Sequence, residues 1–233
     1  MARRWLVIVA AALIAIAGAR YVTAWTADRH PAGNVPISTT DRYSKRSFES
    51  WLAAEPDRAA AFSAFEAFLD DAAVSGVVPN WQLLRTDTNN QIGCPRPAFL
   101  LPPRDKWRNI VAPLRLLKGS IIPAIGPVEV VSSYRTAEFN GCVNGASKSR
   151  HLDFAAIDLV TITERDNRRL FAELCRVHGK LGPASRFGLG AYFDPAKEAT
   201  NRRGRFHVDA AGHRTWGFTK TASSSGCRMF NVK

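Results

Sequence analysis

One carboxylate stands in the middle of an apolar run of this sequence. Asp158 lies in the segment 155–160, which otherwise has the composition of a buried strand. Burial of a lone charge is unfavourable, so this carboxylate needs a charged partner or a metal ion. His151 lies seven residues before it, and His207 lies far downstream. Two histidines and one aspartate are a sufficient ligand set for catalytic zinc, with the fourth coordination position left open for water.

Zinc held in this way lowers the pKa of a bound water toward ~7, so that hydroxide is available near neutral pH. Such a site keeps a net charge of roughly +1, which suits an anionic tetrahedral intermediate. The alternative interpretation is a satisfied core aspartate with two surface histidines, because this spacing also arises by chance. The spacing alone does not decide between the two.

The helices and strands that must position these residues are expected as separate helices and short strands. This pattern predicts an α+β fold rather than a doubly wound sheet. Helical periodicity indicates three helices, at about 56–76, 105–117 and 163–178. Pro113 is expected to kink or divide the second of them. Short strands are expected at 128–131, 155–160, 188–192 and 205–209.

The chain is strongly basic. Lys and Arg number 32 against 20 Asp and Glu, which gives a net charge of +12. Such a surface favours polyanionic partners, which include nucleic acid, anionic lipid and an acidic wall polymer. The basic residues are dispersed and match no nucleic-acid recognition motif, so nucleic acid is not an expected partner.

The first residues predict export. Two arginines precede an uncharged apolar run at 5–19, which ends in the small residues Ala17-Gly18-Ala19. This arrangement is typical of a secretory signal. The run is shorter than the roughly 20 residues of a spanning helix but longer than many signal cores, so a retained membrane anchor is the alternative. Export makes an anionic envelope surface the expected partner.

The four cysteines, Cys94, Cys142, Cys175 and Cys227, all follow this segment, and they form no C-x-x-C pair. In an oxidising compartment they predict two disulfides, with three connectivities open. A zinc site built from all four thiolates is the less favoured alternative, because such sites usually consist of closely spaced pairs.

Five segments, in order along the chain, carry a resemblance to a known family. They are SSYRTAEFN at 132–140, SRHLDFAAID at 149–158, GLGAY at 188–192, FHVD at 206–209 and RTW at 214–216. Together they resemble the zinc D-Ala-D-Ala carboxypeptidases and the related D,D- and L,D-peptidases of bacterial cell walls, over about residues 80–218. The resemblance implies a small antiparallel sheet backed by helices, the hedgehog and D,D-peptidase-like fold, with zinc in a groove at the sheet.

The resemblance also implies roles for individual residues. It makes His151, Asp158 and His207 the ligands of Zn²⁺, and it places Arg135 where it faces the substrate. A guanidinium donates two parallel hydrogen bonds, which suits a peptide carboxylate or an oxyanion. A surface salt bridge is the alternative for Arg135. Ser149 is expected to bond within the loop that aims His151.

Two departures from the family pattern stand out. Phe154 occupies a place where the family usually has glycine. Gly204 and Arg205 occupy places where many relatives have a carboxylate or a histidine, and neither can act as a general base. The expected substitute is Asp209, because side chains two apart in a strand point to the same face as His207 does.

Asp209 then either acts as the catalytic base or braces His207 as an outer partner. His213 is a weaker candidate for the base. Tyr192 is expected to be a packed ring, and a position at the border of the cleft is the alternative.

These observations predict an exported zinc metallopeptidase of the periplasm or cell envelope, free or anchored to the inner membrane. Its substrates would be peptidoglycan stem peptides or cross-links, cut as a D,D-carboxypeptidase or endopeptidase. The alternative is a non-catalytic peptidoglycan-binding module of the same fold. The predicted parts are a signal peptide or anchor at 1–27, a lead-in with one amphipathic helix at 28–79, the zinc peptidase domain at 80–220 and a tail at 221–233.

Overall fold

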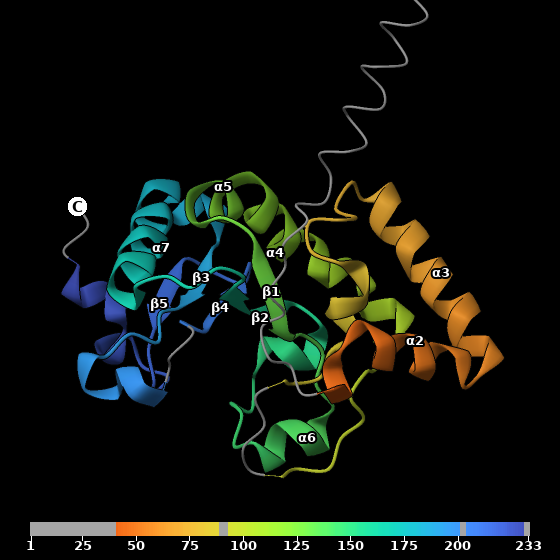
Figure 1. Ribbon diagram of the computed structural model, residues 1–233. Coiled ribbons are helices and arrows are strands. Elements are labelled where there is room, and N and C mark those ends of the chain that lie inside the picture. Colours follow the sequence, from red (N-terminus) through yellow and green to blue (C-terminus); the bar gives the residue numbers. More distant parts are fainter. Residues whose placement is uncertain (1–40, 89–92, 201–203, 231–233) are drawn as a thin grey trace, which may run out of the picture. The chain divides into compact units, whose positions relative to one another are not determined.

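The structure is a computed structural model that describes residues 41–88, 93–200 and 204–230 (Figure 1). The chain divides into two units, Met1–Pro36 and Ile37–Lys233, and all of the described residues belong to the second. The predicted signal or anchor at 1–27 and the first residues of the lead-in lie outside the described residues. Within the described residues, no helix is both long and apolar enough to cross a membrane.

A five-stranded sheet forms the centre of this unit, in the strand order β1-β2-β4-β3-β5. The strands are β1 (Val128–Ser132), β2 (Ala156–Thr161), β3 (Gly188–Gly190), β4 (Phe206–Asp209) and β5 (Arg214–Trp216). Together with the helices around it, the sheet confirms the predicted α+β class.

The sheet is mixed, which corrects the prediction of a purely antiparallel one. β3 pairs with β5 in parallel, whereas the other neighbouring strands pair antiparallel. The reason lies in the short connection 210–213, which reverses the chain after β4 and carries it to the far side of β3. A strand that runs opposite to β4 must run in the same direction as β3, because β3 is itself antiparallel to β4.

Six α-helices are described, and they flank the sheet in Figure 1. They are α2 (Lys45–Ala53), α3 (Pro56–Asp71), α4 (Val111–Leu116), α5 (Ile122–Ile125), α6 (Ala137–Cys142) and α7 (Asn167–Leu181). α2 was not predicted, because it presents few apolar residues, but Ser44 caps it by accepting a hydrogen bond from the Ser47 amide. Its Phe48 packs against Phe62 of α3 at a ring-centroid distance of 5.0 Å.

Two predicted helix boundaries move for local reasons. α7 begins after Asp166 rather than at Thr163, because the Asp166 side chain accepts the Arg169 amide and caps the helix. The helix predicted from about 105 is divided, as expected: a 3-10 helix at Arg104–Ile110 precedes α4. Pro113 then lies in the first turn of α4, where its missing N–H is not needed.

Two disulfides are present, as predicted, and they settle the open connectivity. Cys94 bonds to Cys142 at the end of α6, and Cys175 of α7 bonds to Cys227. All four thiols are therefore used in disulfides, which excludes a zinc site built from them.

Candidate metal centre

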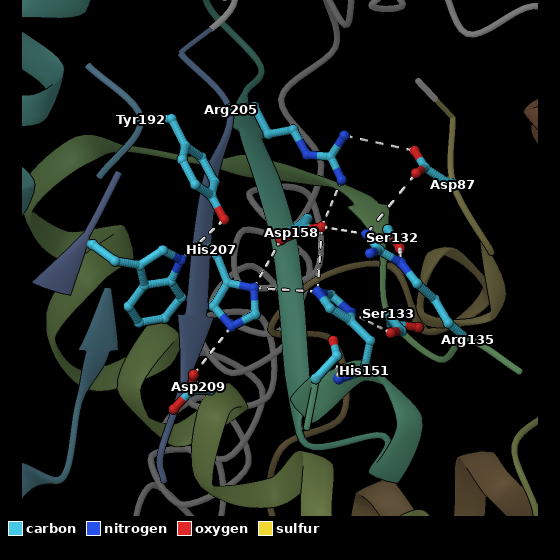
Figure 2. A network of polar contacts seen from close by, with 12 residues as sticks. Asp87, Ser132, Ser133, Arg135, His151, Asp158, Tyr192, Arg205, His207 and Asp209 are labelled. Carbon is cyan, nitrogen blue, oxygen red and sulfur yellow. Dashed lines mark hydrogen bonds and ion pairs between the residues drawn. The ribbon is translucent and has the colours of Figure 1, made fainter. Parts of the chain in front are cut away.

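Three buried side chains converge at the centre of the sheet. Asp158 lies in β2 and is paired in register with His207 of β4, so their side chains point to the same face. His151 comes from the short 3-10 helix Arg150–Asp153, just before β2. One ligand atom from each residue lies within 4.8 Å of the other two. Figure 2 shows the three side chains directed toward one another. The structure thus brings together the three predicted ligands.

The hydrogen bonds of each imidazole indicate which nitrogen is directed to the centre. The Nδ1 of His151 donates to the carbonyl oxygen of Ser133 at 2.5 Å, so its Nε2 faces Asp158 at 3.3 Å. The Nε2 of His207 lies 3.1 Å from the Asp209 carboxylate, so its Nδ1 faces Asp158 at 2.9 Å. The two inward nitrogens are 3.2 Å apart.

This donor set fits a zinc ion. Imidazole ligands of metals usually donate their second N–H to a carbonyl or a carboxylate, which holds the ring orientation and raises the basicity of the ligating nitrogen. Ser133 and Asp209 supply one such acceptor each. Two imidazole nitrogens and one carboxylate are the protein ligands of a zinc site that keeps an open position.

Burial and charge set the protonation of the two histidines in opposite directions. Burial, together with the nearby Arg135 guanidinium, lowers the pKa of His151 to about 4, so this ring is neutral at neutral pH. Burial also opposes the charged form of His207, but its hydrogen bonds to Asp158 and Asp209 outweigh burial and raise its pKa. His207 must therefore give up a proton to act as a ligand.

Asp158 stays ionised although it is buried. Burial opposes the carboxylate form, but His151 and Arg205 hold the pKa of this carboxyl well below its usual value. Its Oδ2 accepts hydrogen bonds from the guanidinium of Arg135 at 2.7 Å and from that of Arg205 at 2.6 Å. The sequence required a partner for this charge, and the structure supplies cations on two sides.

Arg135 forms a salt bridge, as the alternative predicted, but a buried one with Asp158 rather than one at the surface. Its Nε donates to the Ser132 hydroxyl at 3.0 Å, and its Nη2 lies 3.9 Å from the Asp87 carboxylate. Arg205 approaches the same carboxylate at 3.7 Å. Asp87 is thus an anion shared by the two arginines that flank Asp158 (Figure 2).

Asp87 and Arg205 were missed as members of the site. No local pattern indicates Asp87. It reaches the site because residues 85–88 run alongside the end of β1, where the Thr88 amide donates to the Val131 carbonyl and the Ser133 amide to the Arg85 carbonyl. For Arg205 a signal existed, since it precedes His207 by two residues and therefore shares its face of the strand.

Asp209 is fully buried, and both of its oxygens accept hydrogen bonds. Oδ2 bonds to His207 and to Arg214 at 2.7 Å, and Oδ1 accepts the Ala211 amide at 2.8 Å. These bonds lower the pKa of this carboxyl, although burial opposes ionisation. His213, the weaker candidate for the base, stacks on His178 at a ring-centroid distance of 3.9 Å and does not line the cleft described below.

The comparison with known proteins agrees with this geometry. Residues 108–189 match the model of the peptidase M15 family. The matched segment is less than half of the chain, and over it the chain is similar to peptidase M15. The match confirms the resemblance to the zinc D-Ala-D-Ala carboxypeptidases, a family of zinc-dependent metallopeptidases. It includes His151 and Asp158 and ends before His207. No curated protein and no solved structure matches the chain.

Phe154, which stands where M15 peptidases were expected to have glycine, keeps the glycine-like backbone. Its φ is 54°, in the left-handed region, at the turn that leads from His151 into β2. A non-glycine residue there costs roughly 1–2 kcal/mol. Complete burial of the ring, 5.9 Å from that of Phe65, offsets this cost. The departure therefore leaves the turn before Asp158 in place.

Tyr192 takes the position given above as the alternative, because it lines the cleft and its hydroxyl borders the candidate centre (Figure 2). The indole N–H of Trp216 donates to this hydroxyl at 3.3 Å. A Cβ on Gly190, the residue paired with His207, would lie 2.8 Å from both the Tyr192 oxygen and the His207 Cβ, so only glycine leaves room for this ring. Burial and the charge of Asp158 raise the pKa of Tyr192 to about 12, so it keeps its proton.

The candidate centre opens into a cleft of about 780 Å³. Most of the lining residues come from two segments, which we call the walls of the cleft: residues 143–150, between α6 and the turn that carries His151, and residues 214–222. Arg135, Arg205 and the three candidate ligands also line the cleft, so a peptide that enters it would reach them.

Proposed function

We propose that this protein is a zinc-dependent peptidase that hydrolyses peptidoglycan stem peptides or cross-links, as a D,D-carboxypeptidase or endopeptidase. The observation that carries the proposal is the convergence of His151 Nε2, His207 Nδ1 and the Asp158 carboxylate in a cleft. The match of residues 108–189 to the M15 peptidase family supports the same class of reaction. The proposed substrate is a cell-wall peptide, and the bond that is cut is one of its amide bonds.

In this proposal His151, Asp158 and His207 hold the zinc ion. When bound, zinc supplies hydroxide near neutral pH and polarises the carbonyl of the scissile amide. Ser133 and Asp209 orient the two imidazoles. The role of Asp209 as a brace is favoured over that of a base, because both of its oxygens are already engaged and it is fully buried.

Arg135 and Tyr192 are proposed to act on the substrate. Arg135 stabilises the negative charge that develops on the carbonyl oxygen, or holds a substrate carboxylate, and it is positioned by Asp87 and Ser132. Tyr192 accepts the Trp216 N–H on its oxygen, and its raised pKa keeps it a neutral hydrogen-bond donor at neutral pH.

Digestion of purified muropeptides, followed by mass spectrometry and by metal analysis of the protein, tests the proposal and identifies the bond that is cut. We expect cleavage that a chelator abolishes and zinc restores. His151→Ala should lose both zinc and cleavage. His178→Ala is the matched control, because His178 is also buried and bonded to a backbone carbonyl, yet lies outside the centre. Equal loss of zinc in both variants would overturn the assignment of ligands.

A second candidate function is a peptidoglycan-binding module without catalysis. It is favoured by Gly204 and Arg205, which occupy the places where a general base was expected. Retained binding to purified sacculi, without zinc-dependent cleavage of any muropeptide, would select this candidate.

We also propose that the chain is exported, to the periplasm or cell envelope, through its N-terminal segment. The basic surface would then hold it near an anionic envelope surface, and the segment would be either cleaved or retained as a membrane anchor. The hedgehog and D,D-peptidase-like fold is proposed for the sheet and its helices. Cell fractionation with N-terminal sequencing of the recovered chain tests export, and a cytosolic chain with an intact N-terminus would contradict it.

A further inference from the structure

The cleft of the candidate centre carries an excess of positive charge. Two carboxylates, Asp158 and Asp209, are among the described residues that line it, and both are bonded to guanidinium groups. The lining cations are Arg135, Lys148, Arg150, Arg205, Arg214 and Lys220. Arg135 and Arg205 neutralise Asp158, and Arg214 neutralises Asp209. The other three form no ion pair with any described residue.

These three unpaired cations lie on the two walls of the cleft. Lys148 and Arg150 are exposed side chains of the wall 143–150, and Arg150 directly precedes the candidate ligand His151. Lys220 comes from the other wall, 214–222, and its ammonium donates to the carbonyl oxygen of Asn144 in the first wall. A neutral carbonyl does not cancel the charge of the ammonium, so an uncompensated cation lies where the two walls are in contact.

The wall that holds Lys148 and Arg150 is attached at both ends. The disulfide between Cys94 and Cys142 ties its first end, immediately before Val143. At the other end the Ser149 hydroxyl accepts the His151 amide, so the wall continues into the turn that presents a ligand. A wall held in this way loses little conformational freedom when a ligand binds, which favours affinity.

A concave surface of one charge concentrates the field and attracts ligands of the opposite charge. Guanidinium and ammonium groups bind carboxylates through charge-assisted hydrogen bonds. A peptide that is only hydrolysed at its amide needs no second anionic group. Cations that the fold leaves uncompensated, beside the reacting centre and on a fixed wall, are therefore best explained by a second anion on the ligand itself.

We infer that Lys148 and Arg150 form a subsite for a carboxylate of the substrate that lies away from the scissile bond, so that the protein selects acidic peptides over their amidated forms. The inference rests on the proposed function, since it names the peptides that this centre accepts. Amidation is the discriminating change, because it removes the negative charge while it keeps nearly the same shape.

The test compares two synthetic stem peptides that differ only in free or amidated side carboxylates. For the zinc-loaded protein we expect kcat/KM to be at least about tenfold higher for the free acid, the range of one charge-assisted hydrogen bond. The double variant Lys148→Gln/Arg150→Gln should bring this ratio close to one. Lys220 is left intact, because its substitution would also remove the contact between the walls.

The matched control is Arg108→Gln/Lys180→Gln, which removes the same charge from exposed positions that do not line the cleft. It should keep the preference of the unchanged protein. An equal ratio in the two double variants would overturn the subsite, because the preference would then follow the net charge. A ratio near one in the unchanged protein would also overturn it.

Equilibrium binding of the same peptides, carrying a fluorescent label, separates this inference from the proposed function. Selective binding of the free acid that disappears in Lys148→Gln/Arg150→Gln, without any cleavage, would support the subsite and reject the peptidase. Cleavage of both peptides at equal rates, with equal affinities, would reject the subsite and leave the peptidase. The preference should weaken as salt is added, because the interacting groups are exposed.

Discussion

The two faces of the β2–β4 pair are equally buried but are built in opposite ways. On one face Ile157, Leu159 and Val208 belong to the apolar core, and none of them has any exposed surface. On the other face Asp158 and His207 are only 3% and 6% exposed, and they lie in a network of ion pairs. The strands that carry the two sets are the same, and only the alternation of side chains separates them.

The difference shows that burial stabilises one face and has to be compensated on the other. Each apolar side chain gains free energy from leaving water, largely independently of which apolar neighbour it meets. Each buried charge loses its hydration. The favourable energy of its ion pairs seldom exceeds this desolvation penalty. Burial of the polar face therefore lowers stability and is explained by function. Burial of the apolar face supplies the stability that compensates for it.

The largest effect is expected from Asp158→Ala on the polar face. Loss of the carboxylate removes one proposed ligand and leaves Arg135 and Arg205 unpaired beside the two imidazoles. We expect zinc to be lost and activity to fall by more than the ~10²-fold typical for an outer partner of a ligand. Metal analysis and muropeptide hydrolysis measure this. Stoichiometric zinc in the folded variant would show that Asp158 is not a ligand.

Leu159→Ala changes the neighbouring residue on the opposite face. It should lower the free energy of unfolding by about 2–5 kcal/mol, because it removes buried methyl groups and leaves a cavity. The zinc content should stay unchanged. Urea denaturation and metal analysis on the same sample compare the two faces directly, and a folded Leu159→Ala protein without zinc would remove the distinction between them.

Asp209→Asn separates the two roles left open for this residue. If Asp209 braces His207, zinc affinity should fall about 10- to 100-fold, because the ring loses its charged acceptor. Zinc competition with a chromophoric chelator measures the affinity. Unchanged affinity together with slower turnover would instead identify Asp209 as the base.

The smallest effect concerns a buried histidine outside the centre. Burial and the stacked His213 lower the pKa of His178 to about 4, whereas an unfolded histidine titrates near 6.5. Between these values the unfolded chain binds a proton that the folded protein does not, so stability falls as the pH is lowered. His178→Gln should reduce the loss of unfolding free energy between pH 7 and 5 by up to about 2 kcal/mol.

Urea unfolding at both pH values, in the presence of a chelator, measures this loss. His151 has a similarly lowered pKa and remains in the variant, so part of the pH dependence should persist. An identical loss in the two proteins would mean that His178 takes up its proton equally well in the folded state.

Local sequence patterns predicted much of the architecture. The apolar runs at 128–131 and 155–160 predicted two strands, and the spacing of Phe62, Phe65 and Leu69 predicted α3. Four cysteines predicted two disulfides. The alternation of side chains along residues 205–209 predicted that His207 and Asp209 share one face. These features depend on residues close in sequence, whose geometry is set by the repeat of a helix or strand.

Other features depend on which distant segments meet, and no local repeat contains that information. Asp87 reaches Arg135 and Arg205 only because residues 85–88 are hydrogen-bonded alongside the end of β1. The parallel pairing of β5, the partners of the four cysteines and the inward nitrogen of each imidazole also follow from tertiary contacts.

The sequence by itself determined the kinds of side chain available for chemistry, their phase along each strand and the surplus of positive charge. Only the tertiary structure decided which charges neutralise one another and which remain unpaired on the cleft wall. The physical reason is that the energy of a buried charge depends on the atoms within a few ångströms of it, and most of those atoms belong to residues far away in the chain.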